Sequence, residues 1–504
     1  MKKNRLTKQL LAASMLLAAS SLVVSCGNSD NPLSITVDNT TGIPNVTLTS
    51  NGAVISATTA ADISAAFAQL VDDIKAKGVG AGKEYVVEIS SEAFNTIAAQ
   101  NITIPEIEGA TINLVIKDPF TQATTVVIGN STPAGARGMA RTRAEEDEQA
   151  VDKMYITLPD VANGVIPTFE FSRPNTEIVL RSANGNSLIN IKDVNEGSCA
   201  GTFRLGVGVS VDTYKYTQRK EKEHVWLYTE NMTYRDEEND IEKVIALDWE
   251  EQDRTGDGLI IRCLEILPSD NIVRLRIGGE GVEQLILADG VKVETIGWDS
   301  DEQKYVSTGS APSADESVIS KGTSTILLFD DTESQEWKNW INGEYNGIIF
   351  VKKNGESINA LTFRYGNEST KCTFNSEVFY FGSQWNAYED GVTISENKFI
   401  SNGDTHTIEI NVPAESEDKL YELTFNKCDF SANTKFKVNF KSDGYTDFVA
   451  RIYLTDCTYG EGTLTNASSF VESNPTIPEN AQLLYNIGGT DYKVGIGGSL
   501  SVVE

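Results

Sequence analysis

The order of apolar and polar positions repeats near the end of the chain. "LTFNKCDF" at residues 423–430 and "IYLTDCTY" at residues 452–459 share a sequence of apolar, any, apolar, two polar residues, cysteine, any, aromatic. "VTISENKF" at residues 392–399 has the same pattern, with Asn397 aligned with Cys428 and Cys457. From the starting positions of the three copies we expect a unit of about 30 residues.

A second alternating segment repeats between these copies. The segment "TIEINV" at 407–412 is similar to "KFKVNF" at 435–440. Each unit thus holds two period-2 segments separated by polar turns and contains no helical periodicity. These observations predict an all-β fold, a single-stranded parallel β-helix (solenoid), in which each coil stacks on the previous one about 4.8 Å away.

The remaining chain carries the pattern less regularly. "ITIPEIEG" at 102–109 resembles "ITLPDVANG" at 156–164, and "SLINIKDV" at 187–194 fits the template. Residues 274–296 read as three short strands separated by Gly and Asp. We expect the β-helix to cover residues 101–475, with about 30 residues in each coil and a length of about 60 Å. Residues 476–504 are expected to form C-terminal strands or a cap.

The exposed end of such a solenoid needs a cap. Residues 58–77 have helical apolar spacing, a capping-box pattern at Thr59 and Asp62, and Gly78 just beyond the end. We therefore predict an α-helical cap and a first strand within residues 58–100. A helix that leads into the first strand is similar to the N-terminal end of pectate-lyase-like right-handed β-helices.

The segment 1–25 is typical of a secretory signal. A basic start precedes the apolar run Leu10 to Val24, and "VVSC" at 23–26 resembles a bacterial lipobox with Cys26 as the lipidated residue. An ordinary signal with a chance cysteine is the alternative. Residues 26–57 are expected to form a tether and first strands. Together these features resemble the β-helical surface lipoproteins of Bacteroidota, which implies an outer-membrane, lipid-anchored location, surface-exposed rather than periplasmic.

Charge argues against several classes of partner. The formal net charge is −30, and loss of the four signal-peptide cations leaves −34. Such a surface repels phosphate backbones, so we expect no nucleic-acid partner. Outside the signal, no apolar stretch is long enough to predict a transmembrane helix.

Candidate chemistry is sparse. The chain has two histidines, His224 and His406, in unrelated contexts, and it contains none of the common hydrolase, zinc or phosphate-binding motifs, so we predict no cofactor and assign no catalytic residue. "DRTGDG" at 253–258 offers Asp253 and Asp257 as weak calcium ligands, but the later loop positions lack oxygen side chains. An acidic turn is the alternative.

Five cysteines remain after Cys26, so at least one is unpaired within the chain. Cys428 and Cys457 would be ladder neighbours with Cβ atoms about 4.8 Å apart, farther than a disulfide prefers. We predict buried thiols there. Residues 131–150 lack strand periodicity and are predicted to form a flexible insertion. Proteolytic maturation after one of its arginines is the alternative.

Four tryptophans lie in polar stretches that read as turns rather than strand cores, and they are the glycan-binding candidates: Trp298, Trp337, Trp340 and Trp385. Exposed indole faces stack on sugar rings, and a helical turn would place Trp337 and Trp340 on one face. We therefore predict a non-catalytic, membrane-anchored protein that binds glycan or another extracellular ligand along the rod. The alternatives are a polysaccharide lyase or glycosidase of the β-helix type, and a structural, adhesin-like or fimbria-related surface protein.

Overall fold

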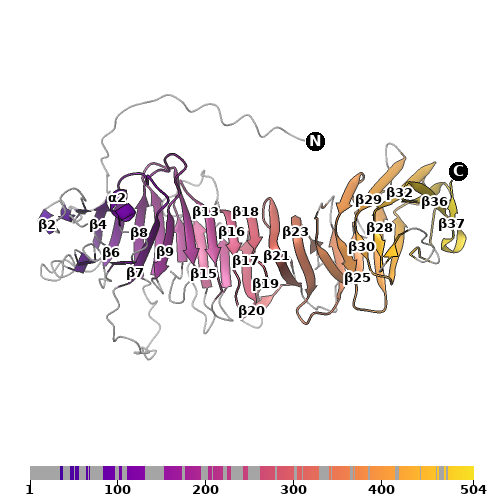
Figure 1. Ribbon diagram of the computed structural model, residues 1–504, viewed down its shortest axis with the longest axis horizontal. Coiled ribbons are helices and arrows are strands. Elements are labelled where there is room, and N and C mark those ends of the chain that lie inside the picture. The colour runs from indigo at the N-terminus through magenta and orange to yellow at the C-terminus, as the bar shows by residue number, and fades with distance from the viewer. Residues whose placement is uncertain are drawn as a thin grey trace, which may run out of the picture.

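The computed structural model shows an elongated molecule in which strands lie side by side along the long axis, from the indigo N-terminal end to the yellow C-terminal end (Figure 1). The structure describes these residues: 34–37, 46–49, 52–55, 64–65, 67–68, 83–96, 101–104, 110–130, 152–172, 176–193, 202–206, 208–218, 224–228, 242–247, 261–278, 281–299, 304–308, 310–328, 340–341, 343–363, 367, 369–383, 386–414, 419–442, 444–460, 462–464, 470–472 and 475–503.

The fold is all-β, and most neighbouring strands pair in parallel. One series of paired strands, ladder A, runs along the whole molecule. In spatial order its strands are β4 (Lys83–Ile89), β6 (Ala110–Ile116), β8 (Asp152–Leu158), β10 (Thr176–Ser182), β12 (Thr202–Leu205), β15 (Glu242–Leu247), β14 (His224–Tyr228), β17 (Val273–Gly278), β19 (Lys292–Asp299), β21 (Ser317–Leu328), β23 (Glu344–Lys352), β25 (Thr373–Phe381), β27 (Lys398–Ile400), β30 (Asp429–Phe430) and β33 (Thr458–Tyr459).

A second parallel series, ladder B, alternates with ladder A in the N-terminal half. It consists of β5 (Asn101–Ile104), β7 (Thr125–Asn130), β9 (Thr168–Ser172), β11 (Ser187–Asp193), β13 (Val209–Tyr216), β16 (Ile261–Ile266), β18 (Val282–Leu287) and the first parts of β21 and β23.

Two further ladders accompany ladder A in the C-terminal half. Ladder C contains β22 (Trp340–Ile341), β24 (Ile358–Phe363), the second part of β25, β28 (His406–Val412) and β31 (Thr434–Phe440). Ladder D contains β26 (Val392–Ser395), β29 (Leu420–Asn426), β32 (Phe448–Thr455) and β35 (Ala481–Ile487).

The change from two ladders to three explains why no single repeat length fits the chain. Where ladders A and B alternate without long insertions, paired residues lie close in the sequence, as in Val273↔Val293 and Ile178↔Phe203. Where A, C and D alternate, the partners lie farther apart, as in Val392↔Leu423. An extra strand and turn lengthen each C-terminal repeat. The expectation of one constant repeat length is therefore wrong for the N-terminal half.

The C-terminal registers predicted from the sequence are confirmed. Val392 pairs with Leu423, and Leu423 pairs with Ile452. Residues 407–412 pair with 435–440 over their whole length. The three strands predicted within 274–296 are also present, as β17, β18 and β19.

Other expected matches are wrong. The segments at 102–109 and 156–164 do not stack, because Ile102 lies in ladder B opposite Ile128 whereas Ile156 lies in ladder A opposite Leu114. The two segments look alike because the strands of ladder A and ladder B have the same alternation of apolar and polar residues. Among the described strands of ladder A, the chain order is also broken, since β15 lies between β12 and β14.

Short antiparallel pairs cover the ends of the ladders. β1 (Ser34–Val37) pairs in parallel with β4 and with β3 (Gly52–Ile55), and β2 (Val46–Thr49) joins β3 in antiparallel fashion. At the other end, β34 (Gly462–Thr463), β36 (Thr490–Val494) and β37 (Leu500–Val502) form antiparallel pairs, with a 3-10 turn at Ile496–Gly498. One antiparallel pair interrupts the middle, where β20 (Lys304–Ser307) returns along β19.

The predicted helical cap over 58–77 is not seen among the described residues. Only residues 64, 65, 67 and 68 of that range are described, and they have helical backbone. The helix that the structure defines near this end is α2 (Ser91–Thr96), which follows β4 directly. The insertion 131–150 and the signal and tether up to residue 33 lie outside the described residues.

The core consists of the inward-facing residues of all the ladders, and stacked phenylalanines mark its C-terminal half. Phe399 lies between Phe374 and Phe430, with ring centroids 5.5 Å away on each side and interplanar angles of 25° and 12°. These three residues are register partners in ladder A and are buried. Parallel in-register pairing therefore places like side chains on one another in the core.

Candidate functional site

The structure leaves the predicted site residues largely untested. Cys26, Asp253, Asp257, Trp337 and Trp385 lie outside the described residues.

The backbones of the other two candidate tryptophans are described, and both are in strands rather than turns. Trp298 lies in β19 opposite Tyr305, and Trp340 lies in β22 opposite Thr362. The helical turn predicted to join Trp337 and Trp340 is therefore wrong at Trp340.

The repeat noticed in the sequence ends at a corner that leads into a strand of ladder A. Four register-equivalent residues stand at this corner and form the corner ladder: Cys372, Asn397, Cys428 and Cys457. Each follows a non-glycine residue with positive φ, between 52° and 57°: Lys371, Glu396, Lys427 and Asp456. Such a left-handed residue turns the chain sharply between two strands at a steric cost.

The corner side chains satisfy backbone groups of the preceding repeat. Asn397 Nδ2 donates to the Ser369 carbonyl at 2.6 Å, and its Oδ1 accepts from the Cys372 N–H at 2.8 Å. Asn397 is fully buried. Without this amide, both backbone groups would be buried unpaired at a turn where no strand partner reaches them.

The cysteines repeat the same geometry with sulfur. The Cys428 thiol donates to the Ile394 carbonyl, and the Cys457 thiol donates to the Phe425 carbonyl, both at 3.4 Å. Each acceptor lies three residues before the corner residue of the preceding repeat, as Ser369 does relative to Cys372. The interchange of Asn and Cys is explained because each can donate to that carbonyl.

The cysteine prediction is confirmed for the described residues. Cys372, Cys428 and Cys457 are free and buried, and Cys263 is free and half-buried. Burial raises the pKa of Cys372 to about 12 and strongly raises the pKa of Cys428. Nucleophilic chemistry requires a thiolate, so the Cys372 and Cys428 thiols are packing and hydrogen-bonding groups. The hydrogen bond with Cys428 instead lowers the pKa of Cys457. The sequence analysis did not align Cys372 with the repeat, although "KCTF" at 371–374 resembles "KCDF" at 427–430.

His406 is a buried base beside hydroxyl groups. Its Nδ1 shares a hydrogen bond of 2.9 Å with Thr434 Oγ1 and lies 3.4 Å from Ser431 Oγ. Its Nε2 is buried without a hydrogen-bond partner, and burial lowers the pKa of the imidazole to about 4. A hydroxyl and an imidazole are two members of a nucleophilic triad, but neither of these contacts of His406 supplies the carboxylate that would orient the ring.

His406 predicts a specific pH dependence of stability. In the unfolded chain its pKa is about 6.5, so the unfolded state binds the proton more readily. Above pH 6.5 the neutral His406 costs the folded state nothing. As the pH falls from 6.5 toward 4, protonation of the unfolded state lowers the free energy of unfolding, by about 2 kcal/mol at pH 5. Urea unfolding at pH 7 and pH 5 measures the loss. His406→Asn should show a smaller loss of unfolding free energy than wild type. Equal losses of unfolding free energy in wild type and His406→Asn would show that His406 is not the group responsible for the pH dependence.

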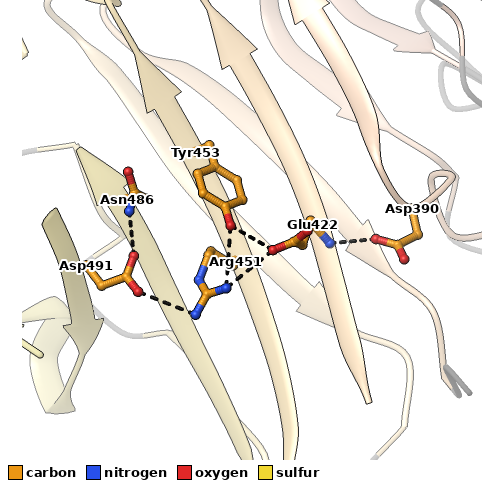
Figure 2. A network of polar contacts seen from close by, with 6 residues as sticks. All are labelled: Asp390, Glu422, Arg451, Tyr453, Asn486 and Asp491. Atoms are coloured by element: carbon orange, nitrogen blue, oxygen red, sulfur yellow. Dashed lines mark hydrogen bonds and ion pairs between the residues drawn. The ribbon is translucent and has the colours of Figure 1, made fainter. Parts of the chain in front are cut away.

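A polar network covers the outer face of ladder D at the C-terminal end (Figure 2). Arg451 lies at its centre. Its Nη1 is 3.3 Å from Glu422 Oε1 on the neighbouring strand, and its Nη2 is 3.4 Å from Asp491 Oδ2 on β36. Tyr453 Oη donates to the same Glu422 oxygen at 2.7 Å. One guanidinium thus connects β29 and β32 with the terminal hairpin.

Two further residues complete this set, which we call the outer polar network. Asn486 Nδ2 donates to Asp491 Oδ1 at 2.7 Å, and Asp390 Oδ1 accepts from the Glu422 N–H at 2.6 Å. With three carboxylates and one guanidinium, the network has a formal charge of −2. Its members are half-buried except Asp390, which is exposed.

The electrostatics of the network keep its phenol neutral and its guanidinium charged. Burial and the hydrogen bond to Glu422 raise the pKa of Tyr453, so its phenol stays neutral. Desolvation is the largest single influence on Arg451 and lowers its pKa, but Tyr453 and the neighbouring carboxylates together raise it further, so the guanidinium stays charged. Neither group can exchange a proton near neutral pH, so the network offers hydrogen-bonding groups and an aromatic ring. Sequence reasoning missed it because Asp491 belongs to the hairpin rather than to the repeat.

Within the described parts of the chain, no group of three or more His, Cys, Asp or Glu side chains is placed to hold a metal ion. None of the described helices has the length and apolar character needed to cross a membrane. The chain matches no known family model, no curated protein and no solved structure. Its function must therefore be inferred from its own residues and contacts.

Proposed function

We propose that this protein is a non-catalytic, lipid-anchored surface protein of the outer membrane in which the parallel ladders form a β-helical rod that binds glycan. In-register pairing along ladder A, from β4 to β33, supports the rod, because each repeat adds one strand spacing to its length. The lipobox-like Cys26 supports the anchor. The N-terminal cap of the rod would begin near Phe67, which is buried.

The outer polar network is the observation that carries the binding part of the proposal. Sugars present hydroxyl groups and apolar ring faces, and a site for them needs fixed planar acceptors and donors beside an aromatic ring. Glu422, Asp491 and Asn486 supply such groups, and Tyr453 supplies the ring. Because the network has net negative charge, neutral glycans suit it better than uronates or sulfated glycans. The candidate tryptophans would extend the surface along the rod.

Titration with neutral and acidic glycans, followed by tryptophan fluorescence and calorimetry, tests this proposal. We expect a neutral glycan to bind and Tyr453→Ala to weaken binding about tenfold through loss of one stacked ring. Trp337→Ala/Trp340→Ala should weaken it similarly if those rings belong to the same surface. Tyr492→Ala, on the neighbouring hairpin, is the matched control.

Three other outcomes would each change the proposed site or the proposed function. Unaltered binding by every variant, with the fold intact, would remove these residues from the site. Absence of binding across the panel would favour a structural or adhesin-like role. Unsaturated or reducing-end products would favour the polysaccharide lyase or glycosidase.

A further inference from the structure

The last strand of the described chain, β37, forms an edge of the molecule. It pairs with β36 on one side, Tyr492 opposite Val502 and Val494 opposite Leu500. No other described strand pairs with it. β36 in turn continues the sheet of ladder D through β35, so β37 is the outermost strand of that sheet (Figure 1).

The hydrogen bonds of β37 show which backbone groups face outward. Val503 N–H donates to the Asp491 carbonyl at 2.9 Å, and Gly495 N–H donates to the Ser499 carbonyl at 2.7 Å. Alternate residues of an antiparallel strand point their polar groups to opposite sides. Leu500 and Val502 therefore direct their N–H and C=O groups away from β36, toward the open edge.

Apart from its short length of three residues, this edge lacks the usual protection against pairing. Natural edge strands commonly carry lysine, proline or a bulge, and β37 reads Leu-Ser-Val without any of these. The exposed large apolar side chains of the described residues are Ile496, Val502 and Val503, all at this end, with exposed fractions of 100%, 58% and 45%.

Local charge permits a second copy to approach. The chain carries a formal charge of −30, which would oppose self-association over most of its surface. Residues 481–504 contain two acids, Asp491 and Glu504, and one base, Lys493, so this segment has a formal charge of only −1. Asp491 is moreover paired with Arg451.

We propose that β37 pairs with β37 of a second copy in antiparallel fashion, giving a two-fold, tail-to-tail dimer. Two identical antiparallel strands are self-complementary: Leu500 of one copy lies opposite Val502 of the other, and a two-fold axis passes near Ser501. The two ladder D sheets become one continuous sheet, and Ile496 and Val502 are covered. The contact is small, so we expect a dissociation constant on the order of 10–100 μM. This inference does not depend on glycan binding.

Sedimentation equilibrium of the mature protein, in density-matched detergent over a hundredfold range of concentration that brackets this constant, tests the dimer. We expect monomer and dimer only, with the longest dimension in solution scattering about doubled at high concentration. Val502→Lys should weaken association at least tenfold, because it places a charge opposite Leu500 of the partner and brings the two lysines diagonally across the two-fold axis. Val502→Pro should do the same by removing an outward N–H, which β36 does not use. Thr393→Lys, an exposed position on the opposite edge strand β26, is the matched control.

Thermal unfolding verifies that each variant is folded, and Val502 is exposed enough for both substitutions to be tolerated. A protein that is monomeric at every concentration would overturn the proposal. So would a dimer that Val502→Lys and Val502→Pro leave intact, a dimer no longer than the monomer, or open-ended growth.

Discussion

Replacing Phe399 with alanine is expected to lower the free energy of unfolding by about 3–5 kcal/mol, the largest effect of any single change proposed for this chain. The ring is fully buried and stacked between Phe374 and Phe430. It also meets Phe379 edge-on at 5.0 Å. Alanine would remove all these contacts and leave a cavity that the rigid strands on each side cannot close.

Urea unfolding followed by circular dichroism measures this loss. Phe440→Ala is the matched control, because Phe440 is only half-buried and lies at the end of β31, and we expect it to cost less than half as much. A loss below about 1 kcal/mol for Phe399→Ala would mean that the ring is not enclosed by neighbouring repeats.

Replacing Asn397 with leucine, a side chain of similar size, is expected to cost about 2–4 kcal/mol. Leucine cannot bond the Ser369 carbonyl or the Cys372 N–H, so two buried backbone groups lose their partner. The same unfolding measurement applies. Asn397→Cys should lose at most half as much stability as Asn397→Leu, because Cys428 makes the equivalent bond in the next repeat. If both variants lost the same amount, the corner side chains would be space-filling only.

Sequence periodicity predicted the C-terminal half well because one face of each strand there is buried. Val392, Leu423 and Ile452 all point inward, and a shift of one residue would expose every one of them. The register is therefore visible in the order of apolar residues alone.

The number of ladders was not predictable in this way. Alternation looks the same on every face, so Ile102 and Ile156 seemed equivalent although they lie in different ladders. The exchange of β14 and β15 in ladder A was likewise not predicted from the sequence.

The candidate site was less predictable than the fold. Polar residues on outer faces are under no burial constraint, so Glu422, Arg451 and Tyr453 resemble ordinary surface residues in the sequence. They become a network only when ladder D places them on adjacent strands and the Gly488–Gly489 turn, with φ of 58° and 87°, folds Asp491 back toward them.

The tryptophans, by contrast, were chosen from their polar context alone. The described strands at Trp298 and Trp340 show how weakly that context predicts a turn. A polar stretch can equally be an exposed strand, because a strand at the surface needs apolar residues on one face at most.

A double-mutant cycle on Phe399 and Phe430 tests most directly whether successive C-terminal repeats lie on one another. Unfolding free energies of Phe399→Ala, Phe430→Ala and the double variant give the coupling between the two rings. We predict about 0.5–1.5 kcal/mol, because the effects of removing stacked rings in contact are not additive. Phe399 paired with the remote Phe171 should couple by less than about 0.5 kcal/mol. Additive losses for Phe399 and Phe430 would contradict the stacking of successive repeats.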